Sequence, residues 1–133
     1  MNADALDFLD FDDVLDVHTA QLGVFGGGSG LRDPALLGSA VAQPQAAFGG
    51  QYAHDGLFAM AAAYLFHVVS NHPFVDGNKR AGLLSALAFL DLNGVTLARP
   101  TAALYALTMG VAEGRVEKAA IAAELERLVT AVA

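Results

Sequence analysis

Residues 57–92 read LFAMAAAYLFHVVSNHPFVDGNKRAGLLSALAFLDL. Two runs in this stretch, 57–71 and from 78 or 79 to 92, are apolar on nearly every side. Such runs are typical of helices at the centre of a bundle. Pro73 must end the first run as a helix, because the residue before a proline avoids the α-helical region. The stretch therefore predicts two buried helices joined by a short polar loop.

The rest of the chain predicts further helices around this pair, and no convincing run of strand residues. Each is bounded by capping, proline or glycine signals. The first runs from a cap at Asp10 to the glycines that begin at Gly23, and the second from Asp33-Pro34 to Pro44. After the central pair, one helix runs from Pro100 to Glu113-Gly114 and the last from about Val116 to Val132. Between Pro44 and Gly56 the pattern breaks down, which indicates a loop or a short hairpin flap. We expect an all-α fold, a compact helical bundle with one flap.

The composition limits what the protein can bind through charge. Its 133 residues include 7 Lys and Arg against 14 Asp and Glu, a formal net charge of −7. Nucleic acids and anionic membranes are bound by clustered basic residues, so we expect neither as a direct partner. No cysteine is present, which excludes disulfides and thiolate catalysis. The apolar run 57–70 is shorter than the roughly 20 residues of a membrane span. We expect a single domain, residues 1–133, in the cytoplasm.

The loop between the two central helices holds the residues with the clearest chemistry. Lys79 and Arg80 lie at a helix N-terminus, where exposed N–H groups and the helix dipole favour phosphate. Gly77 would let a phosphate approach the backbone closely. Asp76 could hold a Mg²⁺ ion that bridges phosphates. His72 could take a proton from an incoming hydroxyl, because imidazole titrates near neutrality. Together these groups indicate phosphoryl or nucleotidyl transfer.

Three features have a plainer interpretation. His72 taken alone could equally be a structural histidine. His18 falls on the apolar stripe of its helix, which favours a core histidine over a ligand. The run 26–30 is rich in glycine, but no Lys-Ser/Thr follows and no strand precedes it, so a linker is favoured over a phosphate loop.

Residues 72–80 resemble the signature of the Fic/Doc superfamily, His-x-Phe-x-Asp/Glu-Gly-Asn-x-Arg. Every specified position matches: His72, Phe74, Asp76, Gly77, Asn78 and Arg80. Segment 30–49 looks like the N-terminal half of Doc-type, or death-on-curing, toxins. Segment 88–94 looks like the end of their second central helix.

The resemblance implies a role for each residue of the motif. His72 would be the general base that activates a Ser or Thr hydroxyl on a target protein. Asp76 would coordinate Mg²⁺, and Phe74 would anchor the loop in the core. The nucleotide phosphates would be bound by the backbone around Gly77 and by the residues that follow it, Asn78, Lys79 and Arg80, with the Asn78 side chain assisting. The flap from about residue 44 to 55 would clamp the target segment as an added strand.

Lys79 bears on the choice between two reactions. AMP-transferring members of the superfamily usually carry a second glycine at this position, whereas Doc-type members carry lysine. The resemblance therefore favours a toxin that transfers the γ-phosphate of ATP to a protein, with translation elongation factor Tu as the target. The alternatives are an AMP-transferase on the same scaffold and, less favoured, a non-catalytic binding module.

A separate protein is expected to inhibit the enzyme. Many members carry an inhibitory Ser/Thr-x-x-x-Glu-Gly/Asn helix. The only Glu-Gly pair here is Glu113-Gly114, and Met109 stands where Ser or Thr is required. The resemblance then implies a Phd-like antitoxin whose tail lies in a groove and blocks the nucleotide site.

Overall fold

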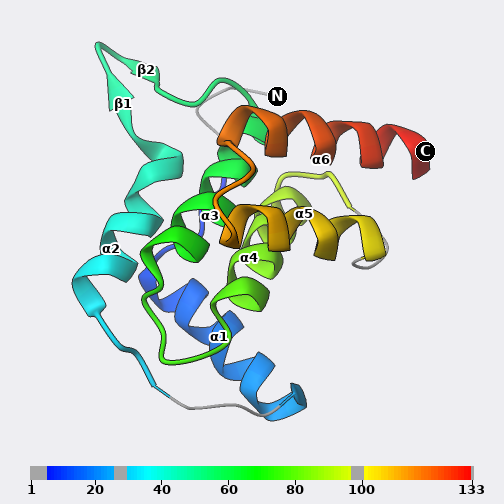
Figure 1. The fold of residues 1–133 in the computed structure, drawn as a ribbon. Helices are drawn as coiled ribbons and strands as arrows, with labels where there is room; N and C mark the ends of the chain where they lie inside the picture. The colour runs from blue at the N-terminus through cyan, green and yellow to red at the C-terminus, as the bar shows by residue number, and fades with distance from the viewer. Residues whose placement is uncertain (1–5, 26–29, 97–100, 133) are drawn as a thin grey trace.

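The computed structural model describes residues 6–25, 30–96 and 101–132, and in this part the chain forms a helical bundle with one small hairpin (Figure 1). The all-α prediction is confirmed, and the flap is a two-stranded hairpin. The elements are α1 (Phe11–Phe25), α2 (Pro34–Ala42), a 3-10 turn (Gln43–Gln45), β1 (Ala47–Phe48), β2 (Gln51–Tyr52), α3 (Leu57–Asn71), α4 (Asn78–Leu92), α5 (Ala102–Ala112) and α6 (Lys118–Val132).

The helix boundaries follow the local signals in most places. α1 begins with a reciprocal cap, in which the Asp13 N–H donates to Asp10 Oδ1 at 2.9 Å and the Asp10 N–H donates to Asp13 Oδ2 at 2.8 Å. These bonds satisfy donors that a helix start leaves without partners. The Asp33 carboxylate caps α2 in the same way, accepting from the Leu36 N–H at 3.2 Å. Both predicted caps are confirmed.

Two starts differ from the prediction. α5 begins at Ala102, because the Thr101 hydroxyl accepts from the Leu104 N–H at 3.3 Å and supplies the cap. Pro100, the predicted start, lies outside the described residues. α6 begins at Lys118, two positions after the expected Val116, whose side chain packs against Gly110 of α5.

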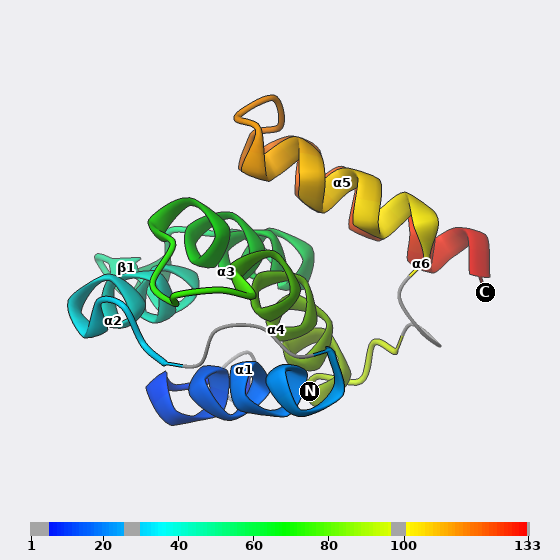
Figure 2. The same cartoon turned by 60° about the horizontal axis from the view of Figure 1, so that its bottom comes forward.

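α3 is the central element, as its apolar sequence predicts, and α2, α4, α5 and α6 pack around it. α1 packs on α4 and α2, along one side of the bundle (Figure 2). Close approach of α3 and α4 depends on Gly82, where an added Cβ would lie 2.8 Å from Val69 Cγ2 and 3.2 Å from the Leu65 carbonyl oxygen. The two central helices therefore hold the loop between them at a fixed spacing.

The core is tied to the N-terminal segment by Tyr64. Its hydroxyl donates to the Leu9 carbonyl at 3.0 Å and accepts from the Leu9 N–H at 2.8 Å. Burial raises the pKa of Tyr64 to about 12. The ring also packs against Phe89 of α4.

Within the described residues, no helix combines the length and apolarity needed to cross a membrane. Positions 26–29 of the glycine-rich run lie outside the described residues.

Candidate active site

The loop between α3 and α4 begins with an abrupt change of backbone direction. His72 caps α3 in the left-handed region, with φ of 52°. Pro73 follows and is buried, and its carbonyl accepts from the Arg32 and Asp33 N–H groups at 2.7 and 3.0 Å. The Arg32 side chain donates to the His72 carbonyl at 2.8 Å. A segment some forty residues upstream thus supports the loop backbone from one side.

Asn78 at the start of α4 holds the loop from within. Its side chain is buried, its Oδ1 accepts from the Phe74 N–H at 2.9 Å, and its Nδ2 donates to the Phe74 carbonyl at 3.0 Å. The same Nδ2 lies 3.1 Å from His72 Nδ1 and 3.4 Å from Nε2. The Asn78 side-chain amide is therefore engaged with the loop and the histidine ring.

Phe74 lies beneath the loop. Its side chain is fully buried, and its ring lies parallel to that of His18 on α1, with centroids 3.7 Å apart and an interplanar angle of 3°. His18 is only 2 % exposed, which confirms the core histidine predicted from the stripe of α1. Its Nε2 is 2.6 Å from the Asp76 carbonyl oxygen. The ring thus touches two residues of the loop.

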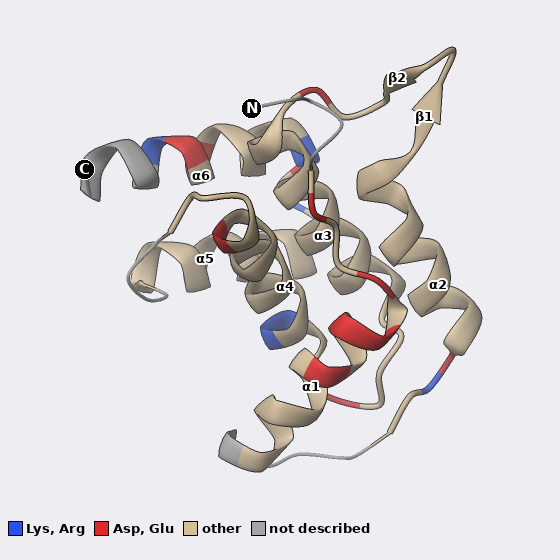
Figure 3. Cartoon of the chain, turned by 180° about the vertical axis from the view of Figure 1, so that it is seen from behind, with Lys and Arg blue, Asp and Glu red and all other residues tan. Residues whose placement is uncertain are grey.

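The remaining motif residues surround the N-terminus of α4. Gly77 is the N-cap, with φ of 80°, a conformation that residues with a side chain rarely adopt. Its N–H donates to Asp76 Oδ1 at 2.8 Å. Lys79 and Arg80 are exposed in the first turn, a basic end of α4 in a molecule where acidic residues predominate (Figure 3). Positive side chains and the helix dipole act together here to attract an anion.

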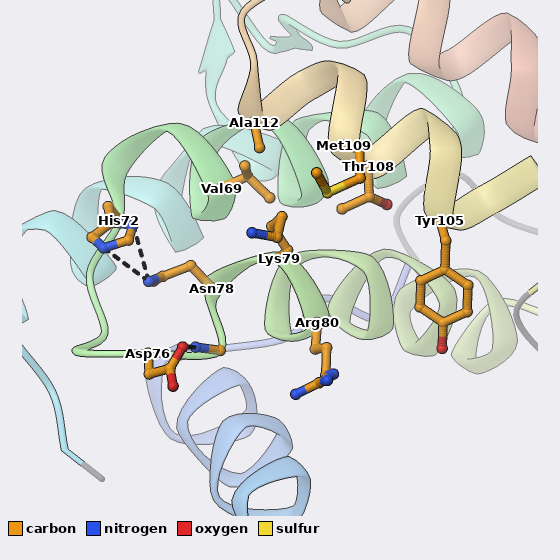
Figure 4. Close-up of a pocket in the computed structure, with 11 residues that line it drawn as sticks. Val69, His72, Asp76, Asn78, Lys79, Arg80, Tyr105, Thr108, Met109 and Ala112 are labelled. Atoms are coloured by element: carbon orange, nitrogen blue, oxygen red, sulfur yellow. Dashed lines mark hydrogen bonds between the residues drawn. The ribbon is translucent and has the colours of Figure 1, made fainter. Parts of the chain in front are cut away.

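A pocket of about 660 Å³ joins these residues to α5 (Figure 4). One side is made by the loop and the start of α4, with His72 and Asp76 through Arg80. The other side includes Tyr105, Thr108 and Met109 of α5. All the predicted site residues except Phe74 line this one pocket, and Phe74 lies beneath the loop that forms its wall.

Sequence reasoning missed the α5 side of the pocket. Tyr105 and Met109 are 48 % and 44 % exposed, and they stand one helical turn apart, each beside a buried residue of α5, Leu104 or Thr108. An aromatic residue and a methionine at this spacing on an exposed face are the signal that could have identified them. His18 and Arg32 were also missed as supports of the loop, because no local pattern links them to residues 72–80.

The donor atoms decide whether Mg²⁺ fits. In the described part of the chain, no group of three or more His, Asp or Glu side chains could form a self-contained metal centre. Mg²⁺ is usually held by one or two carboxylates, with substrate phosphates and water completing its shell. The single Asp76 carboxylate beside the basic N-terminus of α4 fits this second arrangement.

The fold and the pocket define a class: a helical protein whose site is built on the loop between its two central helices. Comparisons with known proteins show which family has this fold and this motif. The model of the Fic/DOC family matches residues 8–90. Toxin Doc of Mycolicibacterium smegmatis (strain ATCC 700084 / mc(2)155) is 47 % identical over 92 residues, which cover 69 % of this chain and 68 % of the relative. Protein kinase doc of Escherichia phage P1 is 34 % identical over 117 residues, 88 % of this chain and 91 % of the relative. The chain belongs to the Fic/DOC family, which confirms the resemblance found in the sequence.

Proposed function

We propose that the protein is a Doc-type toxin that acts as a protein kinase. It transfers the γ-phosphate of ATP to a Ser or Thr hydroxyl of a target protein in the cytoplasm. The target is translation elongation factor Tu, whose modification would block translation. The proposal is supported by the similarity to a protein named as a toxin and to one named as a protein kinase.

One observation carries the proposal. A single pocket brings together a histidine, a carboxylate and the basic N-terminus of a 15-residue helix. The histidine could remove a proton, the carboxylate could hold a Mg²⁺ ion, and the basic helix N-terminus could bind phosphate. Lys79 lines the same pocket, which supports a role in nucleotide binding for the residue at which Doc-type and AMP-transferring members usually differ.

The chemistry follows from the placement of these groups. A ring nitrogen of His72 takes the proton of the target hydroxyl, and that oxygen forms a bond to the γ-phosphorus. The bond from the γ-phosphorus to the bridging oxygen breaks, and ADP leaves with the electron pair. The first turn of α4, with Lys79 and Arg80, binds the phosphates and offsets their charge. Asp76 would hold Mg²⁺, which supplies further neutralisation of phosphate charge when bound.

We further propose that a Phd-like antitoxin inhibits the enzyme by covering this pocket. Tyr105 and Met109 expose apolar surface at its edge, and exposed apolar surface in a small domain favours a protein partner. No inhibitory Ser/Thr-x-x-x-Glu-Gly/Asn motif is present in the chain itself. This supports an inhibitor that is a separate protein.

The decisive experiment uses ATP labelled at either the α- or the γ-phosphate. The purified protein is incubated with Mg²⁺, a bacterial extract and purified elongation factor Tu, with His72→Ala alongside. Label from the γ position alone, absent with the variant, is the expected result. Label from the α position would instead establish an AMP-transferase. Absence of both label and Mg²⁺–ATP binding would favour a non-catalytic module.

A further inference from the structure

The buried imidazole of His18 makes contacts that the proposed chemistry does not use. It comes from α1, yet its ring packs on Phe74 and its Nε2 reaches the Asp76 carbonyl at 2.6 Å. An added Cβ at Gly77 would lie 3.4 Å from both Cδ2 and Nε2 of this ring. Three residues of the loop are thus in contact with, or directly above, one histidine.

The bond to Asp76 fixes the tautomer of His18. A carbonyl oxygen can only accept a hydrogen bond, so the ring nitrogen facing it must carry the proton. Neutral His18 therefore holds its proton on Nε2 and leaves Nδ1 as an acceptor. This assignment is a property of the free protein and needs no ligand to be observed.

The same bond determines where the next N–H points. The Asp76–Gly77 peptide is planar and trans, so its C=O and N–H point in opposite directions. With the carbonyl held toward His18 in the interior, the Gly77 N–H is directed to the opposite side. There it already donates to an anionic oxygen, Asp76 Oδ1, at 2.8 Å. Asp76 and Gly77 both line the pocket.

We infer that His18 is a positioning residue that orients the Asp76–Gly77 peptide, so that the Gly77 N–H faces the phosphates of a bound nucleotide and the Asp76 carboxylate stays beside it. The inference rests on the proposed function for the identity of the anion. Without the bond, the peptide can rotate, since glycine at position 77 restricts it little. An anion site that must reorganise on binding has lower affinity than a preformed one.

Two substitutions separate the hydrogen bond from the packing. His18→Phe keeps an aromatic ring on Phe74 but removes the donor to Asp76. His18→Gln loses the ring but places an amide N–H near the position of Nε2. His67→Phe is the matched control, because it replaces a partly buried histidine of α3 that does not line the pocket.

The experiment combines NMR of the whole chain with titration by Mg²⁺–ATP. We expect the Nε2–H tautomer for His18 in the ¹⁵N spectrum. His18→Phe should shift the Gly77 amide resonance and raise the Kd for Mg²⁺–ATP about 10-fold, the effect expected for one lost hydrogen bond. His18→Gln should recover most of the affinity, and His67→Phe should match the wild-type protein in both measurements.

Several outcomes would overturn the inference. An Nδ1–H tautomer would remove the bond. The inference would also be wrong if folded His18→Phe kept the wild-type Gly77 resonance and the wild-type affinity for Mg²⁺–ATP. Equal losses in both His18 variants would show that the residue acts only through packing. If His18→Phe does not fold, the inference is tested by the tautomer of the wild-type protein and by the affinity of His18→Gln for Mg²⁺–ATP. If the wild-type protein binds no Mg²⁺–ATP, the proposed function fails, and the inference is judged separately by the tautomer and the Gly77 resonance.

Discussion

α3 carries an irregular segment at each end, and the two are built differently. The loop after α3, residues 72–77, is held from three directions: by the buried side chains of Asn78 and His18, and by the segment around Arg32. The hairpin before α3 is a pair of two-residue strands, extended by one bond from the Ala53 N–H to the Ala46 carbonyl at 2.8 Å. All four strand residues are exposed, and the Phe48 side chain is 76 % exposed.

The difference separates two requirements of a protein-modifying enzyme. Chemistry on a phosphate needs donors already fixed at their working positions, because reorganisation during the reaction raises the barrier. Recognition of an extended segment needs unpaired backbone edges and accessible side chains. Under the proposed function the loop would meet the first requirement, and the hairpin, the flap expected from the resemblance, would meet the second. Substitutions in the two segments should therefore affect different measurements.

The largest effect is expected at His72. Replacing it with alanine removes the proposed general base and should lower kcat by at least about 100-fold, the low end of what such a base contributes. The side chain is exposed, so the melting temperature should change little. Val75→Ala is the matched control, since Val75 is an exposed residue of the same loop outside the pocket. A large drop in melting temperature for His72→Ala would instead assign the residue a structural role.

Asn78→Ala should produce the largest loss of stability in the loop. It leaves the Phe74 N–H and carbonyl without their side-chain partner in a buried setting. Each buried polar group left unpaired costs about 1–3 kcal/mol, so for the two groups we expect a loss of about 2–6 kcal/mol in the free energy of unfolding. Urea denaturation measures this loss. Lys79→Ala, at the next and exposed position, should be nearly neutral. Equal stability of the two variants would mean that the loop is held by other contacts.

A smaller, more selective effect is expected in the hairpin. Phe48→Ser should raise the KM for the target protein several-fold, because it removes an exposed apolar side chain without touching the pocket. The Kd for Mg²⁺–ATP and the melting temperature should stay close to those of the wild-type protein. Steady-state kinetics with varied target concentration test this. A change in kcat alone would break the division between the two segments.

How far the sequence could predict these segments depends on the range of the contacts. The end of α3 was predicted because Pro73 acts on its own backbone and its neighbours. The motif residues were predicted to meet in one site because they lie within nine positions of one another. The start of α5 was misplaced because Thr101 is an alternative cap adjacent to Pro100, and propensity does not decide between adjacent capping positions.

The supports of the site were not predicted, because they come from distant parts of the chain. His18 lies 58 positions from Asp76, and Arg32 lies 40 from His72. A histidine on an apolar stripe predicts burial but not the group to which it donates. The role of Asn78 was also only partly predicted: the motif places it at the phosphate site, whereas its side chain holds the loop. Which atoms a buried polar group satisfies is set by tertiary packing.

The base of the hairpin offers the smallest effect and extends the comparison to pH. Lys118 Nζ lies 3.1 Å from His54 Nε2 and 3.0 Å from His67 Nε2, which links the end of the flap to α3 and α6. Burial and then the charge of Lys118 lower the pKa of His67 to about 4, and the same two causes lower the pKa of His54.

These shifts fix the sign of a pH dependence. Below pH 6.5 the unfolded chain binds protons at both histidines, and the folded chain resists binding them. Stability from this cluster is therefore present above about pH 6.5 and lost as the pH falls toward 4. We expect the melting temperature to drop between pH 7 and pH 5 by a few degrees more in the wild-type protein than in His67→Phe. Lys118→Met should show an intermediate drop, because it removes the charge but leaves the burial. Equal drops in melting temperature in all three proteins would mean that the neutral histidines of this cluster do not stabilise the fold. In that case only the loop after α3, which His18 and Asn78 support, would have residues with an assigned stabilising role.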